Sequence, residues 1–167
     1  MFEEWMDQLN ADLEAPELPF SLAEADAVEL VTDLGEEAQE VPAEQEVRQH
    51  LVLEHDGHAA FRSYTAGKGP GKRGIGRVQE VDISPAAMQE ILQLLDAFWY
   101  FRKDTRWSGT KEEARWVLFC RRAGEGTGMI QGELSGAFVA GMDLSFFMRQ
   151  RIPIPKLFLF DGAGDKS

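Results

Sequence analysis

The sequence predicts an α+β protein in which an antiparallel sheet of four to six strands carries one main amphipathic helix on a face. The helix is expected at about residues 85–101, and segments typical of strands lie on both sides of it. The first 46 residues differ, being acidic and interrupted by prolines, and we expect an acidic helical arm followed by a linker. The chain therefore divides into an arm at 1–46, a domain at 47–162 and a frayed tail at 163–167.

The main helix has a predicted start and a predicted buried face. Ser84 is expected to cap it, because a serine hydroxyl accepts from an unpaired N–H of the first turn. Pro85 follows at the first helical position, where the missing N–H of proline is not needed. Six large apolar residues then recur at helical spacing: Met88, Ile91, Leu92, Leu95, Phe98 and Trp99. A sheet must cover this face, because ordering the segment costs about 1–2 kcal/mol per residue.

The strands are predicted from alternation and from turn residues. Residues 47–64 are expected to form a hairpin around a two-residue Asp56-Gly57 turn. This register places three pairs opposite each other, namely His55 with His58, Leu53 with Ala60 and Val52 with Phe61. Further strands are expected at 78–83, 115–122 and 129–140, the last one bent or bulged near Gly132 or Gly136.

Two short elements are expected to close the domain. Asp143 is a candidate cap for a helix at 144–151, which the prolines at 153 and 155 would end. The segment 156–162 is expected to be extended or to form a single turn.

The region before the domain is expected to be helical. Ser21 with Glu24 three residues later is a capping-box pattern, which predicts a second helix over residues 22–34. Residues 36–46 then indicate a solvated linker. Nearer the N-terminus, an apolar stripe at helical spacing is the candidate docking face of the arm: Phe2, Trp5, Met6 and Leu9.

The net charge of −12 is unevenly distributed along the chain of 167 residues. Residues 1–47 carry 15 acidic and no basic side chains, whereas the remainder carries 17 basic and 14 acidic ones. Such asymmetry indicates partner contacts that use charge. The sequence predicts no membrane span and no export signal. Cys120, the single cysteine, is expected to be a small core residue, which fits the reducing cytoplasm.

A glycine-rich basic loop at residues 66–77 is the strongest candidate contact site. A phosphate-binding P-loop would need glycine at Ala66 and serine or threonine at Arg73, so that motif fails. What remains is a flexible loop able to contact an anion or an acidic partner. With the cations that follow the main helix, the candidate partner or anion contacts are Lys68, Lys72, Arg73, Arg77, Arg102 and Arg106.

No catalytic or metal-binding signature is complete. His50, His55 and His58 lie close together in sequence but form an incomplete zinc site, so we expect no metal and no cofactor. The serines lack a nucleophile-elbow context, and no carboxylate pair stands out. We therefore expect no catalytic residues.

The hairpin, the basic glycine loop, the SPAAMQEIL helix, the RWVLFC strand, DLSFFMR and the terminal LFLFDG together resemble a family of small uncharacterised bacterial proteins. Its members are similar in having a Lys/Arg/Gly-rich loop after an aromatic strand and a closing apolar-Phe-apolar-Phe-Asp-Gly segment. The resemblance covers about residues 47–162. It implies one continuous domain and supplies no activity.

These observations favour a non-catalytic binding or regulatory protein, for example one that neutralises a toxin as immunity proteins do. The expected partner is another protein or a second copy of the chain. Nucleic acid is not expected, because the overall acidity opposes it. The alternative is a nucleic-acid or phosphate binder, or an enzyme, that uses the basic loop 66–77.

Overall fold

The computed structural model describes residues 22–35, 42–67, 73–102, 114–123 and 126–162, with the side chains of Ala23, Phe101 and Arg102 left out. Its strands are β1 (Ala27–Asp33), β2 (Glu46–Leu53), β3 (His58–Thr65), β4 (Gly74–Asp82), β5 (Arg115–Arg122), β6 (Gly126–Gly132), β7 (Phe138–Val139) and β8 (Met142–Asp143). Its helices are the 3-10 turn η1 (Leu22–Glu24), α2 (Pro85–Arg102) and α3 (Leu144–Arg151).

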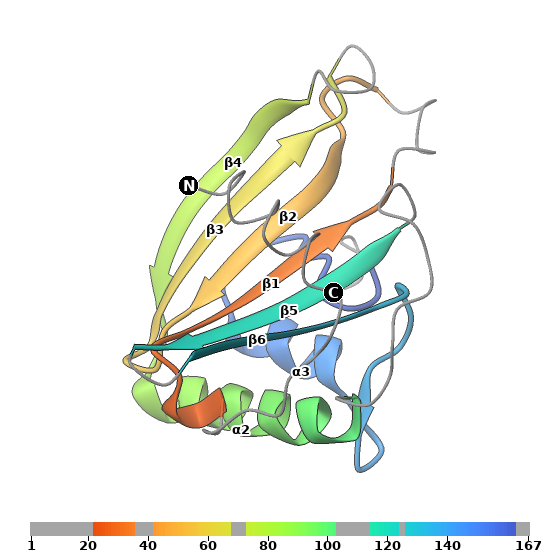
Figure 1. The fold of residues 1–167 in the computed structure, drawn as a ribbon. Coiled ribbons are helices and arrows are strands. Elements are labelled where there is room, and N and C mark those ends of the chain that lie inside the picture. Colours follow the sequence, from red (N-terminus) through yellow and green to blue (C-terminus); the bar gives the residue numbers. More distant parts are fainter. Residues whose placement is uncertain (1–21, 36–41, 68–72, 103–113, 124–125, 163–167) are drawn as a thin grey trace.

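Six strands form one antiparallel sheet in the order β4-β3-β2-β1-β5-β6 (Figure 1). The first four strands follow one another as a meander, and β5 and β6 form a hairpin that pairs with β1. The seam between β1 and β5 therefore joins two segments that lie far apart in the sequence. The predicted α+β class, with a sheet of four to six strands and one main helix on a face, is confirmed.

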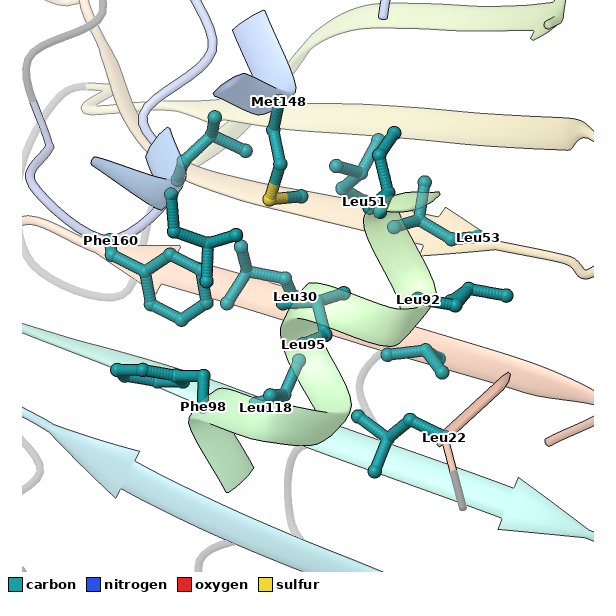
Figure 2. Packing of buried hydrophobic residues seen from close by; sticks show 14 of the residues in the cluster. Leu22, Leu30, Leu51, Leu53, Leu92, Leu95, Phe98, Leu118, Met148 and Phe160 are labelled. Carbon is teal, nitrogen blue, oxygen red and sulfur yellow. The ribbon is translucent and has the colours of Figure 1, made fainter. Parts of the chain in front are cut away.

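Helix α2 forms as the sequence predicts. Ser84 caps it, since its hydroxyl accepts a hydrogen bond from the N–H of Ala87 at 3.1 Å. The six apolar residues of the predicted face are all buried: Met88, Ile91, Leu92, Leu95, Phe98 and Trp99. They share one core cluster with the strand residues Leu30, Leu51, Leu53 and Leu118. Figure 2 shows Leu92, Leu95 and Phe98 of the helix together with these strand residues. We call this side of the sheet the inner face.

Helix α3 and the segment 152–162 complete the cover of the inner face. Asp143 caps α3 as expected, accepting from the N–H of Phe146. Gln49 on β2 holds the segment by donating to the carbonyl of Lys156 and accepting from the N–H of Phe158. The segment thereby places Phe160 in the core.

The predicted helix over residues 22–34 is wrong. Only Leu22–Glu24 turn helically, and Ala27–Asp33 form β1, the strand between β2 and β5. A strand with neighbours on both sides and both faces covered can be almost continuously apolar, which a short window cannot distinguish from a helix. Strand β1 lies before the boundary predicted at residues 36–46 and pairs with β2 and β5, which lie after it.

The predicted register of the first hairpin is wrong by one residue. Leu53 pairs with Ala59 and Val52 with Ala60, not with Ala60 and Phe61. Glu54 and His58 close a three-residue loop, in which Gly57 has a φ of +106°. A type I turn followed by a left-handed glycine is the usual three-residue hairpin. Glycine is required there, since a Cβ would meet the Ile83 carbonyl oxygen at 2.2 Å.

Two other strand bounds differ from expectation. The strand expected at 129–140 is two separate strands, because β6 ends at Gly132 and β7 begins at Phe138 in a small hairpin with β8. Strand β4 begins at Gly74, inside the segment expected to be a loop. The expected tail at 163–167 lies outside the described residues.

Candidate interaction surface

The face of the sheet opposite α2, which we call the outer face, presents a regular array of side chains. Strand pairing aligns them in rows that cross all six strands. One row is Val78, Arg62, His50, Val31, Val117 and Gln131. The next row is Glu80, Ala60, Val52, Glu29, Phe119 and Met129. This mixture of arginine, apolar and carboxylate side chains is suited to binding a partner.

A buried carboxylate anchors one end of the outer face. Asp33 on β1 pairs with Arg48 at 2.7 Å and with Arg73 at 3.0 Å, and accepts from the N–H of Gly35. Burial raises the pKa of Asp33, but the hydrogen bond from Arg73 and the charges of both arginines outweigh it. The pKa therefore lies below its usual value. This group ties the start of β4 to the centre of the sheet.

The second described cation of the basic loop is also engaged internally. Arg77 pairs with Glu46 through two hydrogen bonds of 2.7 and 2.8 Å and donates to the carbonyl of Pro155. Its guanidinium lies 4.8 Å from the centre of the Phe61 ring. Burial raises the pKa of Glu46, but the hydrogen bonds from Arg77 and Ser63 outweigh it, so this pKa is lowered as well.

Both lowered pKa values make stability depend on pH. The ionised carboxylates stabilise the fold above their unfolded-state pKa values of 3.8 and 4.5, and this contribution is lost as the pH falls through the lower folded-state values. Asp33→Asn should lower the free energy of unfolding by about 1–3 kcal/mol near neutral pH, because two guanidinium groups lose a shared carboxylate. The loss should shrink in acid.

Urea unfolding at neutral pH and in acid measures this change. Glu44→Gln, which changes an exposed carboxylate, is the matched control. If Asp33→Asn shows the same loss of stability in acid as the unchanged protein, Asp33 is not a source of the pH dependence.

The centre of the outer face is polar on one side and apolar on the other. His50 on β2 is buried and lies 3.2 Å from Glu29. Burial lowers the pKa of His50 although Glu29 opposes this. On the other side, Val31, Val117 and Met129 form a second core cluster, with Phe119 packed against it. This cluster is not predicted from the sequence, in which residues 27–33 are expected to be helical.

Strand β4 forms one edge of the sheet and is the most open part of the outer face. Ile75 and Val78 are 63% and 60% exposed, beside Tyr64 and Arg62 on β3. The far end of β4 is different, since His58 contacts Asp82 at 3.0 Å and Glu80 at 3.2 Å. Hydrogen bonds to these two carboxylates raise the pKa of His58. One half of this edge is therefore charged, and the other half is apolar.

The predicted contact residues are only partly brought together. Arg73 and Arg77 face Asp33 and Glu46, which lie on β1 and β2. Nothing in the spacing of these residues along the sequence predicts the two ion pairs. The other candidates lie outside the described residues or side chains: Lys68, Lys72, Arg102 and Arg106, and the arm residues Phe2, Trp5, Met6 and Leu9. Those contacts stay predictions.

The histidines do not converge. His50 lies on the outer face beside Glu29, whereas His58 lies at the end of β3 beside Asp82. Within the described ranges no group of three or more His, Cys, Asp or Glu side chains could hold a metal ion. Cys120 is buried on the inner face, and burial raises the pKa of its thiol to about 12.

Comparison of the chain with protein-family models, with curated proteins and with solved structures finds no match. None of the described helices is long and apolar enough to cross a membrane.

Proposed function

We propose that this is a non-catalytic binding or regulatory protein whose partner docks on the edge strand β4 and the outer-face residues next to it. The observation that carries the proposal is the exposure of Ile75 and Val78, at 63% and 60%, on the outermost strand of the sheet. An edge strand presents unpaired backbone N–H and C=O groups that a second chain can use. Exposed apolar side chains beside them supply the burial that such an interaction needs.

The neighbouring side chains support a protein partner. Tyr64 lies opposite Ile75, and Arg62 lies opposite Val78. Tyrosine and arginine are enriched in protein interfaces, since they combine a large contact area with hydrogen bonding. Natural edge strands are usually protected by charge, as Glu80 and Asp82 protect the end of β4. Residues 74–78 carry one charged side chain, Arg77, which pairs with Glu46.

The class of partner is a second protein or a second copy of this chain, with no cofactor. A role in neutralising a toxin or another effector is one concrete form of this proposal. A reducing compartment such as the cytoplasm suits the buried free thiol of Cys120. The competing proposal, a nucleic-acid or phosphate site on loop 66–77, is less favoured because Arg73 and Arg77 are already paired with carboxylates.

The test is affinity capture of the full chain in the source organism, with mass spectrometry of what is retained. Ile75→Lys and Val78→Lys should each reduce the captured partner about tenfold or more, a loss of about 1.4 kcal/mol. Both changes are on exposed side chains, so the fold should remain. Sedimentation of the purified protein identifies the case in which the partner is a second copy.

Phe138→Lys is the matched control, because Phe138 is also 60% exposed but lies on β7, outside the six-stranded sheet. Retention of the partner by both β4 variants, or equal loss with Phe138→Lys, would place the contact elsewhere. Loss of the partner on nuclease treatment would favour the nucleic-acid alternative.

A further inference from the structure

The backbone of β4 alternates between two directions, and two hydrogen bonds show which residues point toward β3. In an antiparallel ladder, neighbouring residues direct their N–H and C=O groups to opposite sides. The N–H of Arg77 donates to the Ser63 hydroxyl at 2.7 Å, and the N–H of Ile83 donates to the Gly57 carbonyl at 2.9 Å. The odd-numbered residues from 77 to 83 therefore point toward β3.

The even-numbered residues of this stretch point away from the sheet. Residues 78–82 pair with β3 in a regular register. His58, which lies opposite Asp82, directs its carbonyl to the N–H of Glu54 and away from β4, as this alternation requires. No described strand pairs with the outward side of β4. The N–H and C=O groups of Val78, Glu80 and Asp82 are thus a row of donors and acceptors that a further strand can use.

A second copy of the chain can use this row by pairing antiparallel about a two-fold axis perpendicular to the sheet. Such an axis keeps both outer faces on the same side, and the residue at the axis fixes the register. An axis at Glu80 or Asp82 places like carboxylates opposite each other, and an axis at Val81 opposes Glu80 to Asp82. Like charges directly opposite each other destabilise a pair of strands.

Two registers avoid this repulsion. An axis at Gln79 opposes Val78 to the carboxylate of Glu80 in the other copy. An axis at Val78 instead places this exposed apolar side chain against itself. It also places Glu80 and Asp82 of each copy against residues 74–76 of the other, which carry no charge. The axis at Val78 therefore suits the side chains best.

We infer that the partner on β4 is a second copy of this chain, paired antiparallel about a two-fold axis at Val78. This inference rests on the proposed function, because it names the occupant of the β4 site. The sheets of the two copies then continue as one sheet, in which Val78 of each copy covers that of the other.

The two ends of β4 carry opposite charge, which also favours antiparallel pairing with itself. At the other end from its start, His58 lies between the carboxylates of Glu80 and Asp82, so this group is negative even when His58 is protonated. The group at the start is positive, because it has three arginines and two carboxylates: Arg48, Arg73, Arg77, Asp33 and Glu46. Antiparallel pairing brings the positive group of each copy toward the negative group of the other. These charges set orientation more than affinity.

Opposite charges introduced at position 78 test the inference in the purified full chain. Val78→Lys and Val78→Glu should each weaken self-association at least about tenfold, because each places like charges against each other across the axis. An equimolar mixture of the two variants should associate again, since the introduced charges are then opposite in sign. Sedimentation over a range of protein concentrations measures all three. Phe138→Lys is the matched control, because Phe138 is equally exposed but lies on β7.

The register has a readout of its own. If the axis were at Gln79, Val78→Lys would face Glu80 of the other copy and strengthen association, which would overturn the inferred axis. Amide exchange of the unchanged protein gives a second measurement that needs no variant. The amides of Val78 and Glu80 should exchange more slowly as the protein concentration rises, whereas those of Gln79 and Val81, already directed to β3, should not change. Exchange of Val78 and Glu80 that is independent of concentration would contradict the pairing.

Failure of this inference can be distinguished from failure of the proposed function. A purified chain that stays monomeric at every concentration, or variants that do not associate when mixed, would overturn the pairing of two copies. If Val78→Lys nevertheless loses a captured partner, the β4 site stands and a different protein occupies it. If Ile75→Lys and Val78→Lys both retain the captured partner, the β4 site is wrong as well.

Discussion

Leu92→Ala is expected to lower the free energy of unfolding by about 2–5 kcal/mol. Leu92 is 0% exposed and lies at the middle of α2, in the core cluster that joins the helix to β1, β2 and β5. Removing three buried carbon atoms loses their transfer free energy and leaves a cavity that the surrounding sheet cannot fully close. Figure 2 shows Leu92 among other labelled residues of this cluster. Urea unfolding followed by circular dichroism measures the change.

Gln93→Ala is the matched control, because Gln93 is the next residue of the same helix and its side chain is exposed. Its effect should stay within about 0.5 kcal/mol. If Leu92→Ala and Leu95→Ala both behave like this control, α2 does not organise the core.

Phe160→Ala is expected to cost about 3–5 kcal/mol. The Phe160 ring lies 5.0 Å from the Phe98 ring on α2 and 5.1 Å from the Trp116 ring on β5, measured between centroids. The three rings join a helix, a strand and the C-terminal segment at one point. Their tilted and edge-on arrangement adds about 0.5–1.5 kcal/mol for each pair to the burial itself.

The same unfolding measurement, with Phe138→Ala as control, tests this prediction. The change Phe138→Ala removes the same ring from an exposed position, so it should have little effect on the free energy of unfolding. A double-mutant cycle of Phe160→Ala with Phe98→Ala isolates the contribution of the pair. A coupling energy near zero, or a small effect of Phe160→Ala alone, would mean that the C-terminal segment is not part of the cooperative core.

The elements predicted best are those whose signals are local. Helix α2 has a cap, a proline at its first position and a regular apolar face, so its start and its buried side follow from the sequence. Strand β1 has no such signals. Its buried residues lie on both faces of the sheet, and its partner β5 is remote in the chain, so a short apolar run does not reveal its place.

The hairpin and the candidate surface show the same limit. The Asp56-Gly57 pair indicated a turn but not its length, and one added loop residue moved every partner along β3. The cations Arg73 and Arg77 could be recognised as charges, whereas their carboxylate partners depend on the strand order. Ile75 was assigned to a loop, so its exposed place on β4 could not be predicted.

The position of β1 matters while the chain is being made. A ribosome completes the meander at Asp82, but β5, which pairs with the other side of β1, is complete only at Arg122. At about 5–20 residues per second, the intervening stretch of roughly 40 residues takes about 2–8 seconds. During that time β1 is a bare apolar edge able to pair with another nascent chain. Slower translation between these residues is therefore expected to lengthen the time for which this edge of β1 is exposed.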